Sequence, residues 1–453
     1  MKSPRKIVAG TLAVAFATSL AACSSSGTSQ TAAPTEGAQQ ACENTITKTN
    51  IPVVTLWAWY PNFSPVVDLY NNAHDDVQVC WVNAGAGPDE YSKLNVALKA
   101  GTGAPDVVMI EADQMPSYIL SGNLIDISKY GANDVKDNYY AGSWSSVTSG
   151  DGVYAIPVDS GPMGLYYRQD LFDKYNIAVP TTWAEFADAA AQLKAAGSGA
   201  VIADWPTNNG GFTTGILAQG GWDPYTFDVA NPTDISVRID SAAGTKVMNY
   251  WFDLIDKGLV DTIDRGTTDF QTKLVNGGNA LYLAAAWGSK NLVGIESTDK
   301  EAVWRAAPLP QWDINNPVAT NWGGANFAVT KYAADQKLAA QVAAGVLGDM
   351  ESWKLGVEGS MLYPTFKPML DSDYFGGLTQ EFFGNQKMNE EVWLPATRLY
   401  KGISYGPVQT FMYDKLHEAM TAAIQKTITP DQILPQVQAE VVKNLKEQGF
   451  SVK

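Results

Sequence analysis

Aromatic rings stand repeatedly beside carboxylate and amide side chains in this sequence of 453 residues. A flat ring packs against an apolar ligand face, whereas carboxylates and amides form directed hydrogen bonds with hydroxyl groups. This combination indicates a binding site for a ligand that carries both kinds of surface. The candidates are Trp59, Tyr60, Asn62, Glu111, Asp113, Gln114, Asp159, Trp205, Asn209, Phe212, Trp222, Asp223, Trp287, Trp322, Asn326 and Tyr405.

Several of these positions also have a structural interpretation. Asp113 precedes Gln114-Met115-Pro116 and could cap the helix that follows. Trp222 follows two glycines and could be a buried ring beside a turn. Trp57, which continues the apolar face of a predicted strand, is expected in the core. Tyr413 lies on a predicted helix and is a further possible contact.

The composition excludes some classes of protein. Hydrophobic residues make up 45% of the chain, so there is enough apolar material for a core. The 47 acidic residues against 31 Lys plus Arg give a formal net charge of -16, which disfavours binding to nucleic acid. With 2 His, 3 Cys and no G-x-S-x-G motif, zinc sites and Ser-His-Asp catalysis are poorly supported. We predict no metal and no cofactor.

Strands and helices alternate after residue 52. Strands are predicted at 53–57, 77–82 and 106–110, with helices at 65–73 and 89–100 between them. This order implies a mostly parallel sheet covered by helices, whose ligands bind beyond the carboxyl ends of the strands. Further helices are predicted at 182–196, 242–257, 268–275, 334–350, 407–426 and 430–447, and further strands at 280–284 and 327–329.

The N-terminus has the layout of an export signal. Lys2, Arg5 and Lys6 precede a short apolar run over 7–20, and Leu20-Ala21-Ala22-Cys23 resembles the lipobox of bacterial lipoproteins. We therefore expect a signal peptide at 1–22, acylation of Cys23 and a flexible tether over 23–42. The alternative is an ordinary signal peptide with an incidental cysteine.

Export places the protein in an oxidising compartment. With Cys23 acylated, Cys42 and Cys80 remain as a pair, and we predict a disulfide between them. The alternative is two buried thiols.

Five segments in order resemble one known family. They are LKAGTGAPDVV (98–108), GVYAIPVD (152–159), LYYRQDLF (165–172) followed by PTTWAEF (180–186), the stretch from 278 to Trp287, and APLP (307–310). These segments resemble the bacterial extracellular solute-binding proteins of family 1, over about residues 52–448. Arg168 departs from the pattern, because the family often has Asn there.

The resemblance implies an α/β fold of two lobes, each a mostly parallel sheet flanked by helices, joined by a hinge with several chain crossings. By matching segments, lobe one comprises 43–158 and 312–356, and lobe two comprises 159–311 and 357–453. Crossings are expected near 157–160, 310–321 and 356–363. Maltose-type members contact sugar hydroxyls through the segment that matches 111–114, and stack rings on sugar at positions matching Trp287 and the loop 205–212.

The family consists mostly of sugar-binding components of ABC importers. The resemblance therefore implies a monomer that captures an oligosaccharide between its lobes, delivers it to permease subunits and catalyses no reaction. It would be held on the extracellular face of the bacterial cytoplasmic membrane by its lipid alone. The alternatives are a binder of a peptide or polyamine, a secreted glycosidase with paired carboxylates, and an adhesive lipoprotein.

Overall fold

The computed structural model describes residues 41–228, 231–293, 297, 299–360 and 362–453. The predicted signal peptide, Cys23 and nearly all of the predicted tether lie outside the described residues. Within the described part of the chain, no helix is both long enough and apolar enough to cross a membrane.

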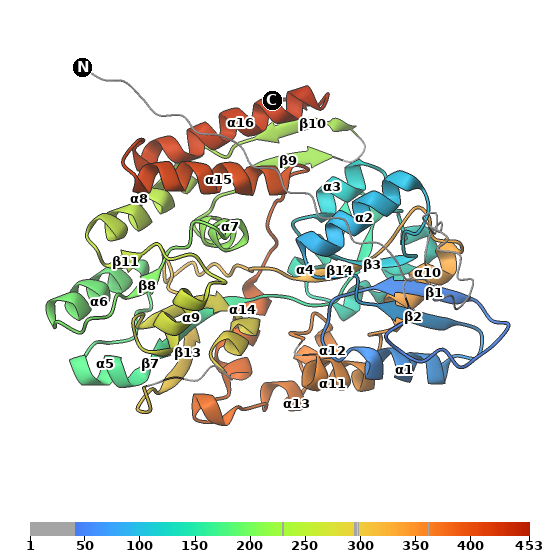
Figure 1. Cartoon of the computed structure of the whole chain (residues 1–453), viewed down its shortest axis with the longest axis horizontal. Coiled ribbons are helices and arrows are strands. Elements are labelled where there is room, and N and C mark those ends of the chain that lie inside the picture. Colours follow the sequence, from blue (N-terminus) through green and yellow to red (C-terminus); the bar gives the residue numbers. More distant parts are fainter. Residues whose placement is uncertain (1–40, 229–230, 294–296, 298, 361) are drawn as a thin grey trace, which may run out of the picture. The chain divides into compact units, whose positions relative to one another are not determined.

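The first lobe is built on a five-stranded sheet in the order β2-β1-β3-β14-β6. The strands β1 (Val53–Trp57), β2 (Gln78–Val82) and β3 (Val107–Glu111) are parallel, as predicted, and are linked by α1 (Ser64–Ala73) and α2 (Pro88–Ala100). In Figure 1, α1 and α2 lie on opposite sides of these strands. The strand β14 (Ala325–Val329) is antiparallel to both β3 and β6 (Ala155–Pro157).

The second lobe differs from the prediction of a mostly parallel sheet. Its central strand β7 (Met163–Arg168) pairs antiparallel with both β12 (Leu281–Ala285) and β13 (Trp304–Pro308). The reason is topological: the chain leaves the hinge along β7, and both later strands run back toward the hinge. Two short pairs among the described strands of this lobe are parallel: β8 (Ala203–Asp204) with β11 (Val260–Asp261), and β10 (Asn231–Val237) with β15 (Ser451–Val452).

Helices cover the strands of the second lobe. They include α6 (Trp183–Ala195), which begins at the predicted cap Thr182, and α7 (Gly210–Gln219) and α8 (Ala242–Asp256). The last two long helices, α15 (Gln409–Ile424) and α16 (Ile433–Glu447), lie side by side next to β9 (Tyr225–Asp228) and β10 (Asn231–Val237) (Figure 1).

The buried residues form two hydrophobic clusters, one around the first sheet and one within the second lobe. Some later segments pack in a different cluster from the lobe that was predicted for them. Residues 362–394, predicted in lobe two, pack in the cluster that contains the first sheet. Trp312, predicted to begin the return to lobe one, packs against Trp183 and Tyr250 of the second lobe. Apolar side chains between the lobes can pack on either of them, so sequence alone does not assign these segments. The chain enters the first sheet again at β14 and the second cluster again at Val408.

The first described residues are attached to the first sheet. A disulfide joins Cys42 to Cys80 of β2, which is the predicted pairing. The backbone N–H of Glu43 also donates to the carbonyl of Trp81. Cys42 and Glu43 are therefore held at one strand of the first lobe.

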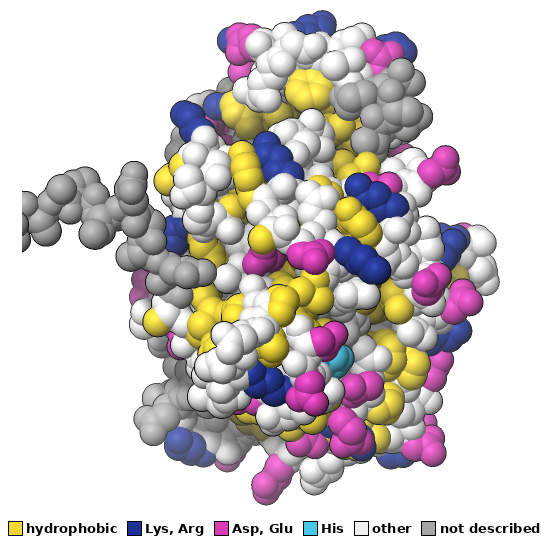
Figure 2. Space-filling model, turned by 90° about the vertical axis from the view of Figure 1, so that its right-hand side faces the viewer, with side chains coloured by type: hydrophobic (Ala, Val, Ile, Leu, Met, Phe, Trp, Pro, Cys, Tyr) yellow, Lys and Arg dark blue, Asp and Glu magenta, His cyan; other side chains and the backbone are white. Residues whose placement is uncertain are grey.

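Charged side chains are mixed on the face of the molecule that Figure 2 shows. Lys and Arg side chains lie singly among acidic and neutral ones there and do not gather into one patch. This distribution provides no basic surface on that face for a polyanion such as nucleic acid.

Candidate functional site

The carboxyl ends of the first sheet meet at a cavity of about 340 Å³. Trp59 and Tyr60 follow β1, and Glu111 ends β3, where it is paired with Ala325 of β14. Trp287 reaches the same cavity from the turn after β12 of the second lobe. Six of the predicted residues line this cavity: Trp59, Tyr60, Glu111, Asp159, Trp287 and Trp322.

Trp287 and Trp322 form an aromatic wall of the cavity. Their ring centroids are 4.6 Å apart, and the indole N–H of Trp287 donates to the carbonyl of Trp322 at 3.1 Å. A glycine makes this wall possible, because a Cβ at Gly161 would lie 1.9 Å from the Trp322 carbonyl oxygen. Both rings are only partly buried, so they retain surface for stacking on a ligand.

Carboxyl groups of the first lobe form a cluster at the cavity. Glu111 accepts a hydrogen bond from the Tyr91 hydroxyl at 3.3 Å, and Asp159 accepts one from the backbone N–H of Ala325. Desolvation raises the pKa of Glu111 to about 8, with a further contribution from the charges of Asp113 and Asp159. Desolvation also raises the pKa of Asp159 to about 7. Near neutral pH these carboxyls therefore include protonated forms, which donate as well as accept hydrogen bonds.

A further acid, Glu90, lies near Glu111 but does not line the cavity. Glu90 of α2 is fully buried, and neither of its carboxyl oxygens has a hydrogen-bond partner in the described structure. Burial raises the pKa of Glu90 to about 9, and the nearby charge of Glu111 contributes to the increase. A protonated Glu90 avoids placing an unpaired charge in the core.

Lys290 is a functional candidate that sequence reasoning missed. It lines the cavity beside Trp287, and its ammonium group lies 5.2 Å from the centroid of the Trp287 ring. The two residues are three apart in the 3-10 helix Ala286–Asn291, which places them on the same side of that helix. The separation of three residues from Trp287 is the sequence feature that could have identified Lys290.

Asp113 and Gln114 contact the second lobe rather than lining the cavity. The hydroxyl of Tyr413, on α15, donates to Asp113 Oδ2 at 3.0 Å. Nearby, the hydroxyl of Thr410 donates to the side-chain oxygen of Gln114 at 3.3 Å. These hydrogen bonds join the two lobes directly.

The structure places several predicted aromatic residues in the second core. Trp205 is 0% exposed and stacks on Trp251, with ring centroids 4.6 Å apart. Phe212 is also fully buried, behind Trp322, at 5.7 Å between centroids. Trp222 is buried and donates from its indole N–H to the carbonyl of Ile239, in accordance with the structural alternative. None of the three lines the cavity between the lobes.

The remaining predicted residues have local partners. Asn209 caps α7 by accepting from the N–H of Phe212. Asp223 forms an exposed ion pair with Arg238. Asn326 is buried and donates to the Ile110 carbonyl, and Asn62 donates to the Gly359 carbonyl. Tyr405 lines a different cavity, of about 420 Å³, together with residues of both lobes.

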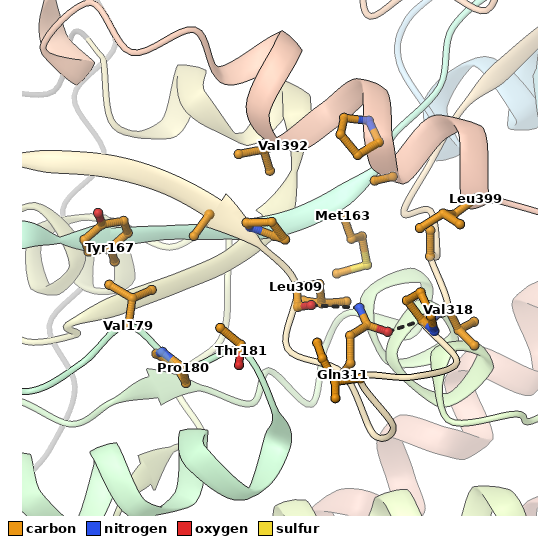
Figure 3. A pocket seen from close by; sticks show the side chains of 17 residues that line it. Met163, Tyr167, Val179, Pro180, Thr181, Leu309, Gln311, Val318, Val392 and Leu399 are labelled. Atoms are coloured by element: carbon orange, nitrogen blue, oxygen red, sulfur yellow. Dashed lines mark hydrogen bonds between the residues drawn. The ribbon is translucent and has the colours of Figure 1, made fainter.

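A separate cavity of about 460 Å³ has apolar walls and lies beside β7, β13 and residues 311–319 (Figure 3). Two of its polar side chains, Gln311 and Thr181, are already engaged in hydrogen bonds. Gln311 donates to the Leu309 carbonyl and accepts from the Val318 N–H, while the Thr181 hydroxyl donates to Glu185. Such a wall offers little hydrogen bonding to a ligand rich in hydroxyls.

Two lobes with a ligand-sized cavity between them, walled by rings and carboxyls, define a two-lobe solute-binding protein. Among the described residues there is no group of acidic, His or Cys side chains that would hold a metal ion. Residues 59–349 match the family model described as bacterial extracellular solute-binding protein, and the chain belongs to this family.

Two of the similar proteins are sugar binders by name. The chain is 26% identical to a lactose-binding protein of Rhizobium radiobacter over 62% of this chain and 67% of that protein. It is similar to the ABC transporter-associated binding protein of B. animalis subsp. lactis in complex with β-1,6-galactobiose. That likeness has 27% identity and a TM-score of 0.73, over 89% of this chain and 100% of the other.

A second structural likeness supports the fold alone. The galacto-N-biose/lacto-N-biose I-binding protein of Bifidobacterium longum is 23% identical, with a TM-score of 0.75, over 90% of this chain and all of that chain. The two-lobe architecture predicted from the sequence is thus confirmed.

Proposed function

We propose that this protein is the substrate-binding component of an ABC importer and captures an oligosaccharide between its lobes. The observation that carries the proposal is the cavity in which Trp287 and Trp322 face the carboxyls Glu111 and Asp159. Indole rings accept the apolar faces of sugars, and the carboxyls hydrogen-bond their hydroxyls. The named ligands of the relatives, lactose and galactobiose, have both kinds of surface.

The proposed mechanism is an exchange between open and closed lobes. A ligand that contacts both lobes shifts the population toward the closed form, by as much as its differential affinity for that form. The permease subunits then recognise the closed form and receive the sugar. In this proposal the protein is a monomer and performs no bond-making, so the carboxyls act only as hydrogen-bonding groups.

The location follows from the N-terminal sequence. We propose that Cys23 is acylated and that the lipid alone holds the folded body at the outer face of the cytoplasmic membrane. The disulfide at Cys42 fits an oxidising compartment. Replacing Cys23 by Ser should release the protein from the membrane. Mass spectrometry of the N-terminal peptide of the wild-type protein should detect the lipid on Cys23.

Calorimetry with a panel of di- to tetrasaccharides tests the binding function. Trp287→Ala should bind at least tenfold more weakly and fold normally, because the ring is partly exposed. The control is Tyr332→Ala, which removes an aromatic ring that is 39% exposed and does not line the cavity. Equal affinity of both variants would contradict the site, and release of hydrolysis products would instead favour a glycosidase.

A further inference from the structure

A second cavity, of about 650 Å³, adjoins the 340 Å³ cavity. The two share Trp287, Lys290 and Leu362 as wall residues. The second cavity is also lined by residues between 375 and 393, a segment that follows the helix α11 (Met350–Gly359). A ligand that lies on Trp287 in the first cavity is therefore next to the second.

The walls of the second cavity have the mixed character of a saccharide site. Trp287, which is partly exposed, supplies its aromatic surface, while Trp393 and Phe375 also line it but are each only 2% exposed. Lys290, Thr379 and Gln380 also line it and are exposed, and their side chains form no hydrogen bond within the described structure. The apolar cavity beside β13 is different, because Gln311 and Thr181 are both engaged there (Figure 3).

The second cavity also reaches the surface. Val293, which lines it, is 41% exposed. A ligand that fills the cavity can consequently extend into solvent at this end.

The volumes of the two cavities also favour a ligand that occupies both of them. The first cavity lies near the lower end of the range of about 300–1,000 Å³ typical of ligand pockets, and the two cavities together approach its upper end. A ligand confined to the first cavity leaves the larger space, with its unengaged polar side chains, to water.

We propose that the 650 Å³ cavity is a second subsite, in which Thr379 and Gln380 hydrogen-bond additional sugar residues of a ligand chain that passes over Trp287. This inference rests on the proposed function and narrows its ligand class to chains longer than the unit that fills the first cavity. Thr379 and Gln380 then determine the preference for longer chains, whereas the first cavity recognises the sugar unit that lies on Trp287.

The test compares homologous β-galacto-, gluco- and arabino-oligosaccharides of two to five units by calorimetry. For a series that binds, wild-type affinity should rise with length until the second cavity is filled. Gln380→Ala should leave disaccharide affinity unchanged and weaken binding of longer chains about fivefold, as expected for one lost hydrogen bond. The double variant Gln380→Ala with Thr379→Val should bind the longer chains more weakly still.

Gln341→Ala is the matched control. Gln341 is exposed on the helix α10 (Gln336–Gly345), forms no side-chain hydrogen bond within the described structure and lies outside these cavities. Its replacement should change no affinity. Wild-type affinity that is independent of length, or an equal loss for short and long chains in Gln380→Ala, would overturn the second subsite. Absence of binding by every saccharide would overturn the proposed function itself, which is a different result.

Discussion

Replacing Tyr413 by Phe tests whether contacts between the lobes, as well as contacts with ligand, set the affinity. The substitution removes one hydroxyl, which donates to Asp113 Oδ2 at 3.0 Å across the lobes. The ring itself stays, packed over the backbone of Gly210 at the start of α7. Neither residue lines the 340 Å³ cavity, so the variant leaves the ligand contacts there intact.

The magnitude follows from the environment of Asp113. A hydrogen bond to a charged group contributes about 1.5–3 kcal/mol, and one between neutral groups about 1 kcal/mol. Burial raises the pKa of Asp113, which weakens the charged form, and we therefore take about 1.4 kcal/mol, just below the range for a hydrogen bond to a charged group. Affinity should therefore fall about tenfold, because each 1.4 kcal/mol lost from the closed state weakens binding by that factor.

The assay is calorimetry on Tyr413→Phe with at least two saccharides of different length. Because the hydrogen bond does not involve the ligand, the loss should be the same factor for each of them. Small-angle scattering of the free protein should show a larger radius of gyration than in the wild type if some closed form is populated without ligand.

Tyr118→Phe is the matched control for this variant. It removes a hydroxyl that donates to Asn95 at 3.0 Å within lobe one, so it should affect stability but not affinity. An equal loss of affinity in both variants, or a loss in Tyr413→Phe that depends strongly on the saccharide, would refute the reasoning.

Two further predictions concern stability. Glu90 has a folded-state pKa of about 9, above its ordinary value near 4.5, so unfolding releases a proton in this range and stability falls as pH rises from about 4.5 to 9. Glu90→Gln should flatten that decline, measured as melting temperature at pH 5 and pH 9; an unchanged slope would show that Glu90 is not buried as a neutral acid. Reduction of the Cys42–Cys80 disulfide, or Cys80→Ser, should lower the free energy of unfolding by about 3–4 kcal/mol, because the bond closes a loop with a sequence separation of 38. Thermal denaturation with and without reductant measures this loss, and an unchanged transition would argue against the bond.

The sequence was sufficient where a residue's place follows from sheet topology. Trp59, Tyr60 and Glu111 follow or end parallel strands, and the carboxyl ends of such strands meet at one edge. Trp287 was predicted from the family resemblance, and the structure places its ring in the same cavity. These positions required only the correct order of strands.

The sequence was insufficient where packing by a distant segment decides exposure. Trp205 begins the loop 205–212, where ligand-stacking rings were expected, but its indole nitrogen lies 3.4 Å from the sulfur of Met420, on α15. Phe212 is covered by Arg265, whose guanidinium lies 4.3 Å from the ring centroid. Neither contact has a local signal, because each depends on how the second lobe closes over its own core.

Closing the lobes without a ligand has opposing contributions. The Tyr413–Asp113 hydrogen bond favours closure whether or not a ligand is present. Burial of Glu111 and Asp159 has a cost of the opposite sign, since both carboxyls are desolvated, which raises their pKa values. In the proposed cycle, sugar hydroxyls replace the lost water at these carboxyls and leave the hydrogen bond between the lobes unchanged. The carboxyl cluster therefore makes closure depend on the ligand, while Tyr413 sets how much binding free energy the ligand must still supply.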